Sequence, residues 1–105
     1  IELGETGQGE ATLHEAVVAC ERLGLIGLQR GSLYNLCCLY SAQGRSAQVL
    51  GCARSIWTLQ PPMDRSELRV LVHLAFVDAQ VALGDLGDAW VHVQAAAEDA
   101  QARDQ

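Results

Sequence analysis

The stretch LYNLCCLYSAQGRSAQVLGCARSIWTLQP, residues 33–61, contains two amphipathic helical patterns that meet at Gly44. Apolar and small residues recur every three or four positions on each side of this glycine, which predicts one apolar stripe on each helix. The two stripes consist of Leu33, Leu36, Cys37 and Tyr40, and of Val49, Cys52, Ala53 and Ile56. Because Gly44 stands where a left-handed residue would end the first helix, we expect a helical hairpin.

Similar breaks occur along the rest of the chain. Gly24 and Gly84 also follow helical patterns and are predicted C-terminal caps, and Pro61-Pro62 interrupts the chain once more. Gly24 and Gly27 should bound the first loop. Apolar and polar residues do not alternate over any useful length, so we expect about five helices, no strand, and antiparallel neighbours.

Two capping boxes predict where helices begin. Thr12 with Glu15 is expected to open the first helix, and Asp64 with Glu67 the fourth, because each pair has the spacing that satisfies free backbone N–H groups. The polar tail, residues 98–105, is expected to fray.

Residues 33–61 resemble a tetratricopeptide repeat (TPR). Its Leu-small pair, Tyr and closing Pro are matched by Leu36, Cys37, Tyr40 and Pro61. Residues 73–96 follow the same plan, and LGDLGDA at 83–89 is similar to the turn between the two helices of a repeat. Gly44 and Gly84 are 40 residues apart, whereas the family's period is about 34.

The resemblance implies an all-α fold in which antiparallel helix pairs stack as a TPR-like right-handed superhelix of about five helices. We expect residues 1–105 to form a single TPR-like segment, with a half-repeat at 1–28 and repeats at 29–62 and 63–105. Each pair would leave an apolar face for the next pair to cover. The sequence starts at Ile1 without a Met, so we expect the segment to be part of a longer protein.

The adjacent thiols Cys37 and Cys38 are interpreted as packing residues. Neighbours on a helix point about 100° apart, and no Cys-x2-Cys or His-x3-His spacing occurs. We predict that Cys37 is a small spacer opposite Ala53. Zinc binding, or pairing with Cys20 or Cys52, is the alternative. We expect no metal and no cofactor.

We predict that the protein is not an enzyme. A catalytic histidine needs an oriented partner, and the one carboxylate near His73 at roughly helical spacing is Asp78. No nucleophile elbow or Gly-rich phosphate loop is found. Trp57 and Trp90 fall on stripes that should face the core, so we expect them to anchor packing.

Composition narrows the choice of partner and compartment. A net charge of −6 disfavours direct nucleic-acid binding. No apolar run approaches the roughly 20 residues that a spanning helix needs, so we expect no membrane insertion. Four Cys without a visible leader indicate a cytoplasmic, reducing location. Half of the residues are hydrophobic, and exposed end helices could support self-association.

The resemblance also implies a function. TPR proteins bind peptides on the concave face lined by the first helix of each pair, so the chain is expected to be a protein–protein interaction scaffold that binds a partner peptide or helix. The residues predicted to line this groove are Tyr34, Cys38, Ser41, Leu74, Asp78 and Val81. Members that clasp a C-terminal carboxylate use Lys and Asn, and this chain has no Lys. The alternative is a regulatory or sensor domain of a larger enzyme or transcription regulator.

Overall fold

A computed structural model describes residues 2–61 and 67–104, which form five α-helices and no strand. The helices are α1 (Glu2–Leu23), α2 (Ile26–Ala42), α3 (Ser46–Thr58), α4 (Glu67–Ala82) and α5 (Leu86–Asp104). The expected all-α class and the number of helices are therefore confirmed.

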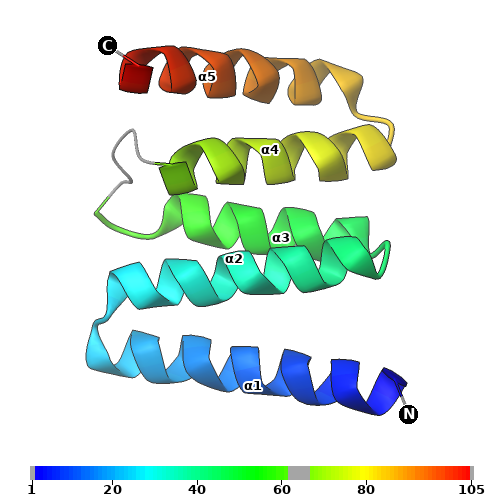
Figure 1. Ribbon diagram of the computed structural model, residues 1–105, viewed down its shortest axis with the longest axis vertical. Coiled ribbons are helices and arrows are strands. Elements are labelled where there is room, and N and C mark those ends of the chain that lie inside the picture. Colours follow the sequence, from blue (N-terminus) through cyan, green and yellow to red (C-terminus); the bar gives the residue numbers. More distant parts are fainter. Residues whose placement is uncertain (1, 62–66, 105) are drawn as a thin grey trace.

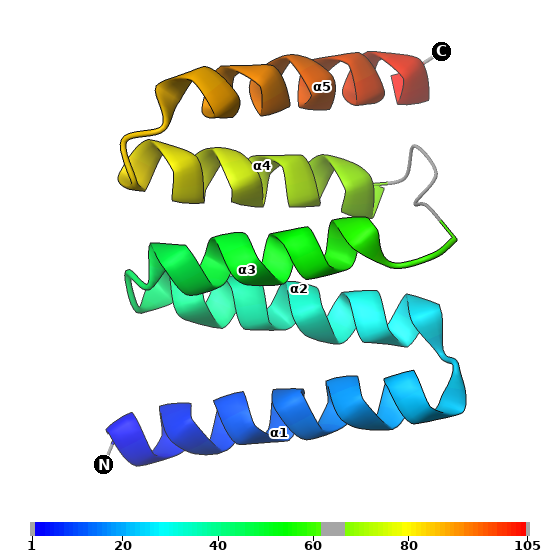
Figure 2. The same cartoon turned by 180° about the vertical axis from the view of Figure 1, so that it is seen from behind.

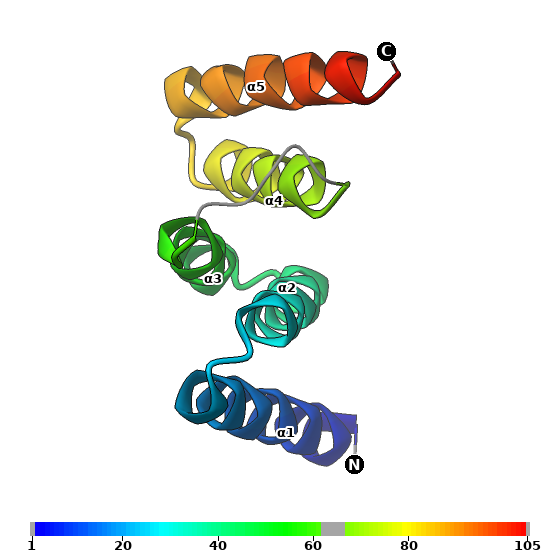
Figure 3. The ribbon, with the colours of Figure 1, turned by 90° about the vertical axis from the view of Figure 1, so that its left-hand side faces the viewer.

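The helices stack in chain order, with the two chain ends at opposite ends of the stack (Figures 1 and 2). Each helix packs on the next in sequence, and α2 also touches α4. Viewed from the side, α3 is displaced from the line of α2 and α4 (Figure 3). The radius of gyration is 14.2 Å, above the value of about 13 Å expected for a compact domain of this length. The molecule is a layered stack in which neighbours stabilise neighbours.

Three of the four connections between helices have the same type of glycine turn. Gly24, Gly44 and Gly84 have φ values of 70°, 70° and 82°. In each turn the glycine N–H bonds a carbonyl three residues back, and the next N–H bonds one five residues back, as from Arg45 to Tyr40 at 2.9 Å. This is the hydrogen-bond pattern of a Schellman motif. The three predicted C-terminal caps are confirmed.

The predicted start of the first helix at Thr12 is wrong, because α1 already begins at Glu2. Glu10, two residues before the expected start, accepts hydrogen bonds from the Tyr40 hydroxyl at 2.8 Å and from Arg45 Nη1 at 3.2 Å. These bonds join α1 to Tyr40 on α2 and to Arg45 in the turn that follows α2. The Thr12–Glu15 pair lies inside α1.

The first loop is also shorter than predicted. The carbonyl of Leu25 accepts a hydrogen bond from the N–H of Gln29 at 2.9 Å. Helical bonding therefore resumes directly after Gly24, and Gly27 lies in the first turn of α2. The predicted box at the start of α4 cannot be compared in the same way, because Asp64 lies outside the described residues.

The expected fraying of residues 98–105 is not observed in the part that is described, since α5 continues to Asp104. Two features stabilise this end. Alanines with high helix propensity precede and interrupt the polar residues. Asp99 is buried, with Oδ2 2.9 Å from Nε of Arg69 on α4.

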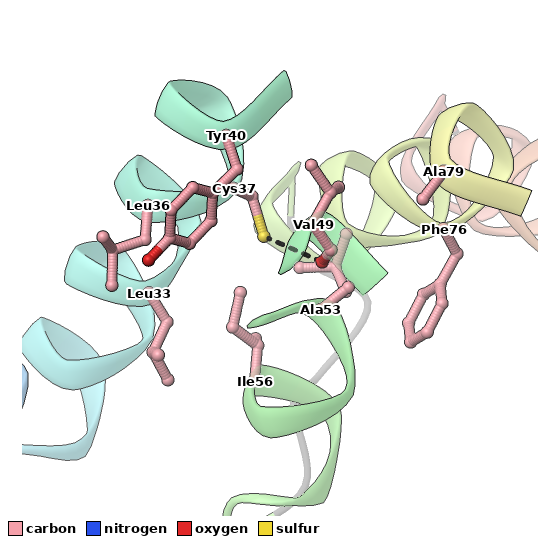
Figure 4. Packing of buried hydrophobic residues seen from close by; sticks show 10 residues of the cluster. Leu33, Leu36, Cys37, Tyr40, Val49, Ala53, Ile56, Phe76 and Ala79 are labelled. Atoms are coloured by element: carbon pink, nitrogen blue, oxygen red, sulfur yellow. Dashed lines mark hydrogen bonds between the residues drawn. The ribbon is translucent and has the colours of Figure 1, made fainter. Parts of the chain in front are cut away.

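The core lies between α2, α3 and α4 (Figure 4). Its buried residues are Leu33, Leu36, Cys37, Tyr40, Val49, Ala53, Ile56, Val72, Phe76 and Ala79. Figure 4 shows the thiol of Cys37 directed at α3, where it donates to the carbonyl of Val49 at a distance of 3.7 Å. All four cysteines are free thiols. The prediction that Cys37 packs between helices is confirmed.

The two tryptophans were expected in the core and are not there. Trp57 is 40% exposed and Trp90 is 61% exposed. Each directly follows the residue that makes the close helix contact, Ile56 on α3 and Ala89 on α5, which are both buried. Successive residues point about 100° apart on a helix. The Trp90 ring therefore turns toward the outside of the stack, while the Trp57 ring is partly exposed and packs against His73 with centroids 4.9 Å apart.

Candidate functional site

A groove with a volume of about 490 Å³ lies between α2 and α4. Its lining residues come from α2, α3 and α4: Tyr34, Cys37, Cys38, Ser41, Ala42, Val49, Leu71, Leu74, Ala75 and Asp78. Five of the six residues predicted from the sequence are thus brought together. The sixth, Val81, is 52% exposed and does not line this groove.

The position of the groove follows from helical periodicity. On α2, the groove residues Tyr34, Cys38 and Ser41 recur at spacings of four and three, so they share one face. That face lies next to the buried stripe that includes Leu36 and Cys37. The helix therefore uses one stripe for the core and the adjoining stripe for the groove.

The walls of the groove are mainly apolar. Leu74 is 48% exposed and faces solvent beside Tyr34 and Leu71 in the same hollow. Burial, together with hydrogen bonding to the Cys38 thiol, raises the pKa of the Tyr34 hydroxyl. Tyr34 therefore remains neutral at physiological pH, and the wall presents a phenol that can bond a ligand.

Within the described ranges, one charged residue, Asp78, lines the groove. The hydroxyl of Ser41 donates to Asp78 Oδ2 at 2.9 Å and so joins α2 to α4. In the described part of the chain, Asp78 forms no ion pair. The site combines an apolar hollow with one oriented carboxylate, which suits binding better than bond-making chemistry.

A second polar cluster lies between α4 and α5. The ring nitrogens Nδ1 of His73 and His92 are 2.8 Å apart, and Nε2 of His73 is 3.7 Å from Oδ2 of Asp99. The ring of His92 stacks on Phe76 at 4.3 Å, and Trp57 lies against His73 with centroids 4.9 Å apart. These contacts hold both imidazoles inside the stack.

The environment of the two histidines suppresses their charge. Burial, the neighbouring His92 and Arg69 lower the pKa of His73 more than Asp99 raises it. Burial lowers the pKa of His92 more than Asp88 raises it. His73 is only 3% exposed and does not line the groove, so it has no access to a ligand bound there.

Sequence reasoning missed this cluster because it considered Asp78 as the partner of His73. The sequence contains a signal for this cluster, because its polar residues fall on shared helix faces. Arg69 and His73 are four residues apart on α4, and His92 and Asp99 are seven apart on α5, so each pair shares a helix face. Only the packing of α4 on α5 joins the two pairs. Among the described residues, no group of three or more His, Cys, Asp or Glu is placed to hold a metal ion.

Comparisons with protein families, curated proteins and solved structures give no significant match to this chain. Within residues 2–61 and 67–104, no helix has the length and apolar character needed to cross a membrane. A proposal for the function therefore depends on the fold and on the geometry of the groove.

Proposed function

We propose that this chain is a non-enzymatic interaction scaffold that binds a peptide or helix of a partner protein in the groove between α2 and α4. The proposal is supported by one observation above the others. Five residues selected from two separate helices line a single, mainly apolar hollow. Preformed helices offer such a surface without the cost of ordering it when the partner binds.

The same proposal includes a TPR-like arrangement. In it, α2–α3 and α4–α5 are the helix pairs of a right-handed superhelix, and α1 is the second helix of a preceding pair. Small residues on helices that pack on one another support this reading, because they allow close approach. The buried ones are Cys37, Ala53, Ala79, Ala89 and Ala96.

Several functional expectations stay predictions alongside this proposal. They are the absence of enzymatic activity, the cytoplasmic, reducing location, the lack of direct nucleic-acid binding, and self-association through the end helices. The alternative of a regulatory or sensor domain also stays a prediction. Groove binding is compatible with either role, so we test binding itself.

Selection from a random peptide display library, with the chain as bait, tests the proposed function. The affinity of a selected peptide is then measured by fluorescence anisotropy for the wild type, Tyr34→Ala and Leu74→Glu. A carboxylate at position 74 would be desolvated under an apolar ligand, so we expect Leu74→Glu to weaken binding by about tenfold or more.

The matched control is Leu86→Glu, because Leu86 is 65% exposed on α5 and does not line the groove. This variant should bind like the wild type. Circular dichroism confirms that every variant is folded. A library that yields no binder, or a peptide that binds both groove variants as tightly as the wild type, would overturn the proposed function.

A further inference from the structure

The charge distribution in the groove is one-sided. Asp78 is the single charged residue among the described residues that line it. The chain as a whole carries a net charge of −6 and has seven basic residues, all of them Arg. Among the arginines of the described part of the chain, none lines the hollow. An acidic ligand would therefore meet repulsion at the groove and from the surrounding protein.

The carboxylate is also held in place. Oδ2 of Asp78 accepts the Ser41 hydroxyl bond at 2.9 Å, and the described residues supply no hydrogen bond to Oδ1. The carboxylate thus has its orientation fixed from α2 while its second oxygen can accept a further bond. A Lys ammonium or Arg guanidinium is the donor that would also neutralise its charge.

The neighbours of Asp78 exclude a purely basic ligand. Leu74 and Ala75 line the hollow one turn before Asp78 on α4, and Tyr34 and Cys38 line it from α2. These side chains gain little from contact with a fully hydrated cationic chain, whereas an apolar side chain would remove them from water. The ligand therefore needs a cationic group for Asp78 and apolar side chains for the wall within a short distance of each other.

We propose that the occupant of the groove is an apolar segment of another protein that carries one Lys or Arg beside its apolar side chains, and that Asp78 receives this cation. The inference rests on the proposed function and adds the chemistry of the partner. Asp78 then acts as the specificity residue of the site, and the apolar wall supplies most of the contact area.

The peptides selected from the display library test this inference directly. We expect them to combine aliphatic or aromatic residues with a Lys or Arg. For one such peptide, Asp78→Asn should raise the Kd about two- to fivefold at low salt, the range of a solvent-accessible ion pair. The same substitution should have no effect on a peptide whose Lys is replaced by Gln.

The matched control is Glu98→Gln, which makes the same change in net charge at an exposed position of α5. It should leave the Kd unchanged. If selected peptides bind in a Leu74-dependent manner but lack a cation, or bind Asp78→Asn as well as the wild type, the inference is wrong and the proposed function stands.

Two other results would distinguish a partner peptide from an empty groove or from a second copy of the chain. If no peptide is enriched, both the function and the inference fail. Sedimentation at two protein concentrations tests a second copy as the occupant. We expect the wild type not to self-associate through the groove, so Leu74→Glu should not change how the sedimentation coefficient depends on protein concentration. Self-association that this variant abolishes would assign the groove to another copy of the chain and overturn the inference.

Discussion

Acidification should destabilise the stack through the buried histidine pair. The 2.8 Å contact between Nδ1 of His73 and Nδ1 of His92 requires one nitrogen to donate and the other to accept. A neutral or singly protonated pair can keep this bond, with the remaining protons on the Nε2 atoms. A doubly protonated pair cannot, because both Nδ1 atoms would then carry hydrogen.

The sign and size of the effect follow from proton counting. The pKa values of both rings are lowered in the folded chain, so the unfolded chain binds more protons below its ordinary histidine pKa of about 6.5. Stability is therefore lost as the pH falls through this value. A ring that binds no proton in the folded chain over this range costs at most about 1.4 kcal/mol between pH 7.5 and 5.5. Solvent near the half-buried His92 reduces the total, so we expect a loss of about 1–2 kcal/mol.

Three charged groups among the described residues enter this balance. From α4, Arg69 opposes protonation of His73, and from α5, Asp99 favours it and Asp88 favours protonation of His92. The contact from α3 is the uncharged ring of Trp57. The ordinary pKa of histidine, about 6.5, lies within the pH window, so the two histidines dominate the change.

Thermal or urea denaturation at several pH values between 7.5 and 5.5 measures the loss. His92→Gln keeps a hydrogen-bonding side chain but removes one titrating ring, and should reduce the pH dependence by about half or more. The comparison variant is His14→Gln, which removes a histidine of α1 together with its 3.0 Å bond to the Tyr40 hydroxyl and leaves the His73–His92 pair intact. A wild-type stability that is flat across the window, or an unchanged slope in His92→Gln, would refute this reasoning.

Three further predictions concern packing and accessibility. Gly44→Ala should lower the free energy of unfolding by about 1–2 kcal/mol in urea denaturation, because the φ of 70° is strained for alanine even though an added Cβ meets no neighbour. Gly51→Ala, in the exposed middle of α3, should instead raise it by about 0.5–1 kcal/mol. Equal effects of the two substitutions would contradict the assigned turn. Ile56→Ala removes a side chain that is 0% exposed and should cost about 2–5 kcal/mol, while a loss below 1 kcal/mol would place it outside the core. A thiol reagent should modify the exposed Cys38 rapidly and Cys37 only on unfolding. The reason is that the adjacent Cys52 thiol and burial raise the pKa of Cys37. Equal modification rates, measured by mass spectrometry, would show that α2 is oriented differently.

Local chemistry explains which parts of the fold could be predicted. The helix ends at Gly24, Gly44 and Gly84 depend on a left-handed residue that the sequence displays directly. Helix α1 instead extends ahead of Thr12 through Glu10, which bonds Tyr40 and Arg45, and no local pattern contains those contacts. The tryptophans were misplaced because bulk and stripe position favour burial, while close helix packing favours their smaller neighbour, as with Ala89 beside Trp90.

The candidate site divides in the same way. The groove residues of α2 and α4 could be selected because each set shares a helix face, and the repeat pattern aligned the two helices. Val81 fell outside because the hollow ends one turn earlier on α4, at Asp78. The bond from Ser41 to Asp78, and the pairing of His73 with His92, required the distances between helices that only the structure supplies.

Nuclear magnetic resonance mapping of a selected peptide on the isotope-labelled chain tests the central claim most directly. Groove binding predicts that the backbone signals of Tyr34, Cys38, Leu74 and Asp78 shift most, and that the outer faces of α1 and α5 are unaffected. The largest shifts on α1 or α5, with the α2 and α4 signals unchanged, would contradict groove binding.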